Sequence, residues 1–473
     1  MPAQLAILLC SVGVALLFYL NRDNSVRVSR ALWIPVIWLL LIGSRPISNW
    51  FGDTSPTLSS DLDGSPVDAA IYAVLIASGF MVLVIRGKRT RSYLAHITPV
   101  IVYFVYCLIS VMWSPVPGPS LKRWIKDVGD VVMVLIIVTD TQPLDALRRL
   151  YSRVGLVLFP ISLVLIRYTA LGRAWNNDGL LSIVGVSTDK NMFGLILYAI
   201  SLGVLWNFRW LLMNRGERNR NRRLVAQGVL LVFGLVELLM SHSSTSLVCF
   251  FIGSTFMLAT HLPAIRYRPS RLHLLVLALL ALGGGAVIFG LAGSVANALG
   301  RDTSFSGRTL IWAALLPAVS NPMIGTGFDS FWHSPNVLLF QSALNSQGWY
   351  HAELLNEAHN GFLEVYLNLG WIGVCLIVVI LTTGYSRALK ALGRNHDLGG
   401  LMLAYIIAGL IYNSTEAGFR EMSVNWIFIL LAVVGASGVN AGLFADGTAK
   451  LVSQPESSVA SRPYKILPGQ ARS

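Results

Sequence analysis

A histidine followed by a polar helix face is the feature of this sequence best suited to chemistry. His359 precedes Asn360, and Asn360, Glu364 and Asn368 then recur at every fourth position. Residues four apart lie on one helix face, so these three form a polar stripe within an apolar segment. A lone histidine is more often structural than catalytic. At the mouth of such a segment, however, His359 is a candidate general base, and the stripe below it is expected to face a cavity within the protein.

Two basic sites could hold an anion. Arg308 stands in the first turn of a predicted short helix, where it opposes the helix dipole and therefore needs another partner. A guanidinium can hold phosphate in a bidentate fork; the alternative is a surface arginine that extends toward water. Residues 173–191 form a polar loop that begins with Arg173 and ends with Lys190 and Asn191. The last two lie at the start of a predicted helix, where backbone N–H groups favour an anion.

Two short polar turns complete the set of candidates. Residues 241–246 form a hydroxyl-rich turn that includes Ser243, and residues 413–416 read Asn-Ser-Thr-Glu and end with Glu416. Each turn by itself is more simply interpreted as a capped, solvated connection. Together with the histidine and the cations, they provide the groups that an anionic lipid carrier with a sugar chain would require.

The elements that must position these residues are membrane-spanning helices. Hydrophobic residues make up 54% of the chain and charged residues 12%, whereas a soluble domain carries roughly 25% charged residues. The charges fall between apolar stretches of about 17–22 residues, the length that crosses the hydrocarbon of a bilayer. Such stretches must be helical because their backbone amides have no water partners. The sequence therefore predicts an all-α bundle of about 12–13 transmembrane helices, the first segment being the weakest candidate.

The net charge of +13 reflects membrane topology rather than nucleic-acid binding. Most of the Lys and Arg residues fall in alternate loops, with a dense run between residues 209 and 223. Because positive loops stay in the cytoplasm, and such clusters can also contact anionic lipid heads, we expect no nucleic-acid partner. The candidate residues above all fall on the opposite, outer side. With thirteen spans, the N-terminus lies outside and the C-terminus inside.

Four regions follow from this topology. Residues 1–293 are predicted to hold helices 1–10, residues 294–358 a large outer loop with short helices, and residues 359–440 helices 11–13. Residues 441–473 are polar and are expected to form a disordered cytoplasmic tail. The four cysteines stand singly in apolar stretches, without metal-ligand or disulfide spacing. We expect neither a metal nor another cofactor.

The ordered motifs resemble those of the O-antigen ligase superfamily, which includes O-antigen ligases, Wzy-type polymerases and exopolysaccharide polymerases. The histidine pattern is present as His359-Asn360, nine residues, Gly370, two residues and Gly373. Arg308 in SGRTLIW and the run NPMIGTGFDSF from residue 321 are similar to family elements. The DKN run at residues 189–191 resembles an HKN element of exopolysaccharide members, with Asp189 in place of histidine. The likeness extends from about residue 95 to 440.

The resemblance implies a GT-C-like glycosyltransferase of the bacterial inner membrane that acts at the periplasmic face. The donor would be a glycan on undecaprenyl pyrophosphate. In that scheme His359 would be the general base or would position the acceptor. Arg308, with Lys190 or Arg173, would stabilise the departing pyrophosphate. Glu364 and Glu416 would orient His359 or bind sugar hydroxyls, and Asn191, Asn360 and Ser243 would contact substrate.

The acceptor is not fixed by the resemblance. A carrier-linked repeat as acceptor makes the enzyme a polymerase, which the DKN run and the hydroxyl-rich turn favour; lipid A core as acceptor makes it a ligase. A flippase or transporter is the alternative from another class, although the polar groups gather at the outer face rather than near the midplane. The sequence leaves open whether a chain-length regulator binds.

Overall fold

The computed structural model describes residues 2–23, 27–51, 65–175, 181–263, 271–278, 305–346 and 355–444. Most of the predicted disordered tail and much of the predicted tenth span lie outside these residues. The described part is almost entirely helical, and its strands form one short antiparallel hairpin that pairs Arg173 with Ile183. The helices and strands are α1 (Ala3–Leu20), α2 (Trp33–Ile42), α3 (Ile47–Trp50), α5 (Pro66–Ile85), α6 (Gly87–Leu94), α7 (Thr98–Ser110), α8 (Pro117–Val138), α9 (Pro143–Tyr168), β1 (Arg173–Trp175), β2 (Leu181–Ile183), α10 (Lys190–Met213), α11 (Arg220–Met240), α12 (Ser244–Ala259), α16 (Phe305–Leu315), α17 (Asn336–Ser346), α18 (Gly361–Arg394), α19 (His396–Thr415) and α20 (Val424–Asn440).

The predicted polytopic helical bundle is confirmed. Six helices of the described residues are long and apolar enough to cross a membrane, and a seventh span forms if α6 and the bent segment that follows it are counted together. Four shorter apolar helices, and α8 with its charged first half, account for further predicted spans. The count of 12–13 stays a prediction, because part of the predicted tenth span is not described.

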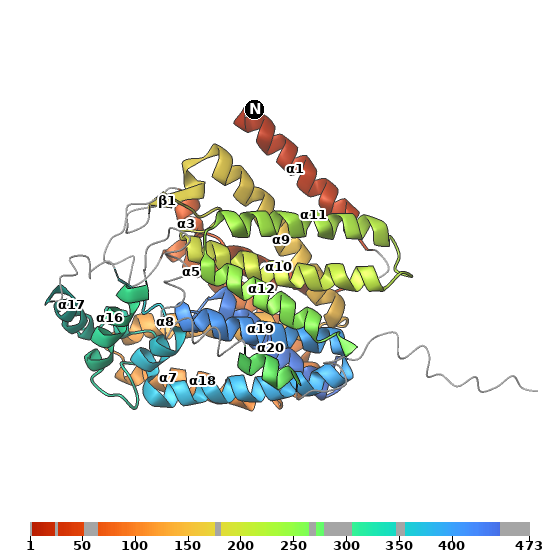
Figure 1. Ribbon diagram of the computed structural model, residues 1–473. Helices are drawn as coiled ribbons and strands as arrows, with labels where there is room; N and C mark the ends of the chain where they lie inside the picture. The colour runs from red at the N-terminus through yellow and green to blue at the C-terminus, as the bar shows by residue number, and fades with distance from the viewer. Residues whose placement is uncertain are drawn as a thin grey trace, which may run out of the picture.

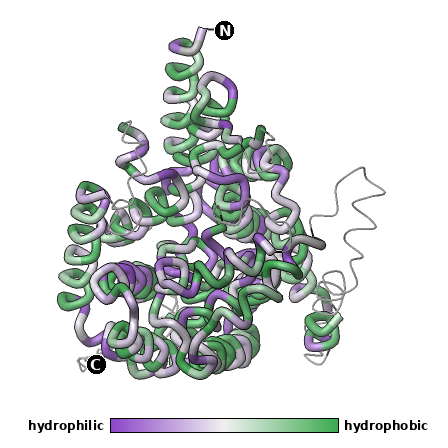
Figure 2. Tube along the Cα trace, turned by 90° about the vertical axis from the view of Figure 1, so that its left-hand side faces the viewer, coloured by the Kyte–Doolittle hydropathy of each residue, from purple (hydrophilic) through white to green (hydrophobic). Residues whose placement is uncertain are grey.

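The bundle has a buried centre and an apolar outside. α18 packs against α19 and α20, and α19 also packs against α12. α19 and α20 are apolar all round and buried along most of their lengths, as expected for helices at the centre of a membrane bundle. By contrast, α5 leaves Val84 and Ile85 74% and 77% exposed. Hydrophobic residues also cover the outer helices in Figure 2, and an apolar surface of this extent fits contact with lipid.

Polar structure is concentrated at the two ends of the bundle. Figure 1 shows α10, α11, α12, α18 and α19 side by side, with α16 and α17 at one end and the α10–α11 connection at the other. The first end therefore holds the loop and hairpin that contain the candidate residues. The second holds the run of arginines between residues 209 and 223. This separation agrees with the charge alternation of the sequence.

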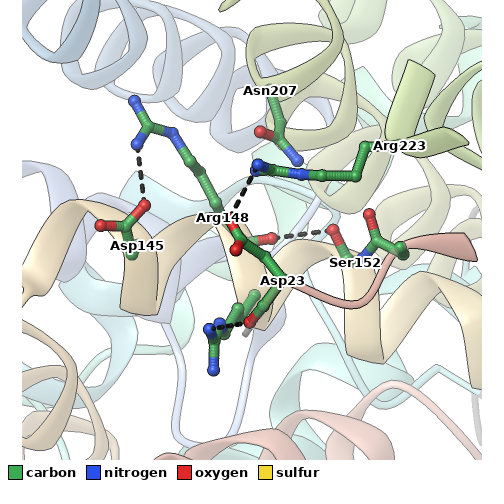
Figure 3. Close-up of a pocket in the computed structure, with 8 residues that line it drawn as sticks. Asp23, Asp145, Arg148, Ser152, Asn207 and Arg223 are labelled. Carbon is green, nitrogen blue, oxygen red and sulfur yellow. Dashed lines mark hydrogen bonds and ion pairs between the residues drawn. The ribbon is translucent and has the colours of Figure 1, made fainter. Parts of the chain in front are cut away.

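A buried ionic cluster joins helices at the arginine-rich end. Arg223 Nη1 lies 2.9 Å from Asp23 Oδ2, Arg149 Nη2 donates to the Asp23 carbonyl at 2.9 Å, and Arg148 Nη1 lies 2.9 Å from Asp145 Oδ1. These side chains and Asn207 surround a cavity of about 20 Å³ (Figure 3). A space of this size holds little more than one water molecule. The cluster therefore fastens the end of α1 to α9 and α11, and it is too small to bind a glycan.

Candidate active site

His359 lies where the chain enters α18. The side chain of Asn360 caps this helix, because its Oδ1 accepts hydrogen bonds from the N–H groups of Phe362 and Leu363 at 3.0 and 3.1 Å. An asparagine N-cap satisfies amides that the first turn leaves without partners, so α18 begins at Gly361. His359 itself has a φ of 49°. This left-handed conformation is costly for a residue other than glycine and is often found at functional sites.

Two glutamates and two arginines surround the imidazole. His359 Nδ1 lies 2.9 Å from Glu357 Oε1 and 3.3 Å from Glu416 Oε2. Arg308 donates to Glu416 Oε1 at 3.1 Å and to the carbonyl of Thr415 at 2.6 Å, and Arg420 donates to Glu357 Oε2 at 3.3 Å. We call these five residues, Arg308, Glu357, His359, Glu416 and Arg420, the His359 cluster. The structure thus brings together three predicted site residues, Arg308, His359 and Glu416, from distant parts of the chain.

The cluster stabilises the charged form of the imidazole. Burial alone would lower the pKa of His359, but hydrogen bonds and charges from Glu357 and Glu416 outweigh it and raise the pKa to about 10. Burial acts to raise the pKa of Glu357, yet His359 and Arg420 hold that pKa below its usual value. For Arg420, burial is outweighed by nearby carboxylates, chiefly Glu357, so its pKa is raised. At neutral pH the resting imidazole is therefore protonated, with Nδ1 donating to the carboxylates.

The same residues have the composition of a metal site but not its surroundings. The ligand atoms of Glu357, His359 and Glu416 lie within 4.8 Å of one another. However, a metal ligand at Nδ1 would have to be deprotonated, and Arg308 and Arg420 already occupy the second oxygens of both carboxylates. Two neighbouring guanidinium groups also disfavour a further cation. The arrangement is better suited to an anion than to a metal ion.

The start of α12 contacts both the end of α19 and the start of α10. The hydroxyls of Thr245 and Thr415 lie 3.1 Å apart, and Ser243 Oγ donates to Asn191 Oδ1 at 3.3 Å. The turn that holds Ser243 therefore lies between Asn191 and the residue that precedes Glu416. Lys190 is the first residue of α10 and is half-buried. Its ammonium has no hydrogen-bond or ion partner among the described residues.

Arg173 and Asn360 have different surroundings from those predicted. Arg173 is exposed on β1, and the contacts of the described residues do not link it to the His359 cluster. Asn360 Nδ2 reaches the carbonyl of Ser414 at 3.5 Å while its Oδ1 caps α18. Asn360 therefore holds the start of α18 beside the end of α19.

Glu364 lies on the other side of the segment that precedes His359. Its carboxylate accepts hydrogen bonds from the indole N–H of Trp332 at 3.1 Å and from the Ala358 N–H at 2.6 Å. Glu416, rather than Glu364, contacts His359. Glu364 and Asn368 both line a cavity, as the polar stripe predicted.

The two glycine-containing motifs pack against each other. Gly370 has φ 62° and ψ −165°, which interrupts α18; this region of backbone space is essentially limited to glycine. The interruption leaves the carbonyls of Leu367 and Asn368 free, and Thr326 and Gly327 donate to them at 3.0 and 2.8 Å. The side-chain oxygen of Asn368 accepts from two further amides of the same loop. The neighbour of Gly370 is therefore the loop of residues 321–332.

Beside the His359 cluster lies a cavity of about 990 Å³. Its wall includes α7, α8, α17, α18 and the loop of residues 321–335. Arg420 belongs both to this wall and to the His359 cluster. The cavity is at the upper end of the size range of ligand pockets, so it can hold several sugar residues. We call it the α8 cavity.

Two arginines that fix this architecture were missed in the sequence. Arg45 is buried and donates to the carbonyls of Leu171, Gly185, Val186 and Ser187, so it fastens the loop that leads to Lys190. Arg123 lies 3.2 Å from Asp329 Oδ2 and also donates to the Asp329 carbonyl at 2.7 Å. Their only sequence signal was a basic residue at the outer end of a predicted span.

Comparison with known proteins agrees with the motifs. A family model described as O-antigen ligase matches residues 229–378, a range that includes Arg308, His359 and Gly370. The exopolysaccharide production protein ExoQ of Rhizobium meliloti (strain 1021) is 27% identical over 325 residues, which cover 66% of this chain and 69% of that protein. With its bundle of apolar helices, this multi-pass membrane protein is similar to the O-antigen ligase family over residues 229–378 and to ExoQ over 325 residues.

Proposed function

We propose that the protein is a polysaccharide polymerase of the inner membrane that joins glycan repeats carried on undecaprenyl pyrophosphate, at the periplasmic face. The observation that carries the proposal is the His359 cluster: an imidazole held by two carboxylates and bordered by arginines, next to a cavity large enough for a glycan. The printed name of ExoQ, an exopolysaccharide production protein, supports a polymer product.

In the proposed reaction a hydroxyl of the acceptor sugar attacks the anomeric carbon of the donor. The new bond joins the acceptor oxygen to that carbon, and the bond to the pyrophosphate oxygen breaks. His359 Nε2 takes the proton of the hydroxyl while Nδ1 stays hydrogen-bonded to Glu357 and Glu416. The neutral imidazole is the reactive form. Because the pKa of His359 is about 10, the neutral ring is a strong base, but only a small fraction of the protein carries it at neutral pH.

The departing group carries the pyrophosphate charge. Arg308 is positioned by Glu416 and Thr415, and Lys190 stands at the amino end of α10. Cations that are fixed in place before the reaction stabilise developing charge without reorganisation. Asn191 and Ser243 would contact the pyrophosphate or the first donor sugar. A chain-length regulator would be a further partner of the proposed polymerase.

A ligase is the second candidate, because the matching family model is described as O-antigen ligase. The glycans of the host strain distinguish the two functions when wild type, a deletion and His359→Ala are compared at equal expression. Loss of long polymer with accumulation of single repeats on the carrier supports the polymerase. Long polymer that stays on the carrier and is absent from lipid A core supports the ligase. A wild-type profile in His359→Ala would contradict both and would favour a transporter.

A further inference from the structure

The α8 cavity contains more basic groups than the proposed chemistry uses. Arg420 contributes to the His359 cluster, and Arg123 is engaged by Asp329 and by His333 Nε2 at 2.7 Å. Lys122 and Lys126 line the same cavity and have no role in the transfer step. They stand four residues apart, which places them on one face of α8.

The position of these lysines in the membrane is unusual. They lie in the first half of α8, at the end of the bundle that holds the His359 cluster and opposite to the arginine-rich end. Lys and Arg are biased toward cytoplasmic loops, so basic residues at the other end need a separate reason. Lysines that extend toward water from a helix end are the simpler explanation. Their place in the wall of a cavity of about 990 Å³ favours a ligand instead.

The cavity wall is held in shape before any ligand binds. Arg123 fixes Asp329, the interruption at Gly370 receives the loop of residues 321–332, and Ser120 Oγ donates to the carbonyl of Phe328 at 2.6 Å. Trp332 also contributes to the wall, with its indole N–H fixed by Glu364. A wall of aromatic and polar groups held in this way suits a sugar chain, because little ordering is needed on binding.

Donor and acceptor must approach the reacting carbon from different directions. The cations assigned to the departing pyrophosphate, Arg308 and Lys190, belong to the elements around α10, α12, α16 and α19. The α8 cavity is bordered by α7, α8, α17 and α18, and the segment of residues 355–358 stands between the two regions. The acceptor is therefore the substrate that the cavity can hold while the donor occupies the Arg308 side.

We infer that the α8 cavity binds the acceptor glycan and that Lys122 and Lys126 bind an anionic group on it. The inference rests on the proposed function. The anion is either a carboxylate on the acceptor sugars or the pyrophosphate of the acceptor's own carrier. Both offer oxygens that an ammonium group can bind through charge-assisted hydrogen bonds.

The test uses the full-length protein in lipid nanodiscs. The donor is the carrier-linked repeat purified from the host, at a fixed saturating concentration. The acceptor is a fluorescent carrier-linked repeat in which a phosphonate replaces the anomeric linkage, so that it accepts glycan but cannot donate it. For K122Q/K126Q we expect the KM for this acceptor to rise roughly tenfold or more, with kcat unchanged. K122R/K126R should stay near wild type, which also shows that the site folds.

A charge-matched control is available at the opposite end of the bundle. Lys88 and Lys390 are exposed residues of the predicted cytoplasmic loops, and K88Q/K390Q removes the same net charge from the protein. An acceptor KM in K122Q/K126Q within about twofold of this control overturns the inference. To identify the anion, the acceptor glycan is also supplied as an alkyl glycoside, which lacks the pyrophosphate but keeps any carboxylates of the sugars. If K122Q/K126Q still raises the KM, the anion is a sugar carboxylate; if wild type and variant become equal, it is the pyrophosphate.

Equilibrium binding of the fluorescent acceptor without donor separates the two hypotheses. Weaker binding to K122Q/K126Q than to K88Q/K390Q supports the acceptor site whether or not turnover is seen. If wild type binds the acceptor through these lysines yet forms no polymer with any acceptor, the proposed polymerase function fails and the binding site stands. Equal binding by both double variants refutes the site.

Discussion

Removing the charge of Glu357 tests whether the neutral imidazole of His359 is the reactive form. Glu357 Oε1 lies 2.9 Å from His359 Nδ1, and Glu416 Oε2 lies 3.3 Å from the same nitrogen. Burial acts to lower the pKa of His359, but these carboxylates raise it from 6.5 to about 10. A rise of this size corresponds to about 5 kcal/mol of preference for the charged ring.

Glu357→Gln keeps a hydrogen-bond acceptor beside His359 and removes one of the two negative charges. A neighbouring opposite charge moves a pKa by roughly 1–3, and Glu357 is the nearer of the two glutamates. We therefore expect the pKa of His359 to fall to roughly 8 in the variant. Glu217→Gln is the matched control, because Glu217 also pairs with an arginine, at 3.3 Å from Arg223, but at the opposite end of the bundle.

The assay is kcat/KM for glycan transfer by purified protein as a function of pH. If neutral His359 is the base, the rate rises with pH and levels off near the pKa of the free enzyme. The plateau should then begin about two pH units lower in Glu357→Gln than in wild type or Glu217→Gln. An inflection at the same pH in all three would refute the electrostatic role of Glu357. A rate that falls as pH rises through this pKa would identify the imidazolium as the active form and refute the general-base role.

Three further predictions concern the architecture. Gly370→Ala places a Cβ 2.3 Å from the carbonyl carbon of Met323 and forces alanine into a backbone conformation that is limited to glycine. The backbone strain alone costs about 1–3 kcal/mol, so the Tm should fall. Gly13→Ala is the control and should not lower the Tm, because its Cβ meets no atom within 4 Å. Arg45→Met removes the side-chain donor from the carbonyls of Leu171, Gly185 and Ser187, whereas the backbone N–H of residue 45 still reaches the Val186 carbonyl. Each carbonyl that stays buried without a donor costs about 1–3 kcal/mol, so the variant should be cut faster in limited proteolysis. Because the pKa of His359 is higher in the folded than in the unfolded protein, its protonation stabilises the fold fully below about pH 6.5, and this contribution is lost as pH rises through about 10. The decrease in Tm at alkaline pH should therefore be smaller in His359→Gln than in wild type.

The residues of the His359 cluster could be predicted in part because each stood out locally. His359 lay at a span mouth, Arg308 opposed a helix dipole, and Glu416 ended a polar turn. Their actual pairing joins residues that are 57 and 108 positions apart, and such distances are fixed by helix packing rather than by local sequence. The assignment of Glu416 instead of Glu364 as the partner of His359 could therefore come only from the structure.

The residues that were missed act through the backbone of remote segments. Arg45 reaches carbonyls more than 120 positions away, and Arg123 reaches Asp329 across 206 positions. A guanidinium that binds remote carbonyls leaves no local pattern in the sequence, and the acidic partner of Arg123, Asp329, is equally remote. Gly370 gave a pattern, but a glycine in an apolar helix fits helix packing as well as a helix interruption. Only its positive φ and the docked loop distinguish the two.

The division of α18 explains how one helix can serve two substrates. The segment just before α18 contributes Glu357 and His359 to the His359 cluster on the side of α19, while Glu364 and Asn368, in the first two turns of the helix, face the α8 cavity. The interruption at Gly370 ends this polar section, and the loop of residues 321–332 satisfies the freed backbone groups that lipid could not. Below it the helix is apolar and can cross the membrane. Gly370 of the motif and Asn368, two residues before it, therefore shape the wall of the α8 cavity, and the adjoining His359 is where, in our proposal, a hydroxyl from that side would meet the donor.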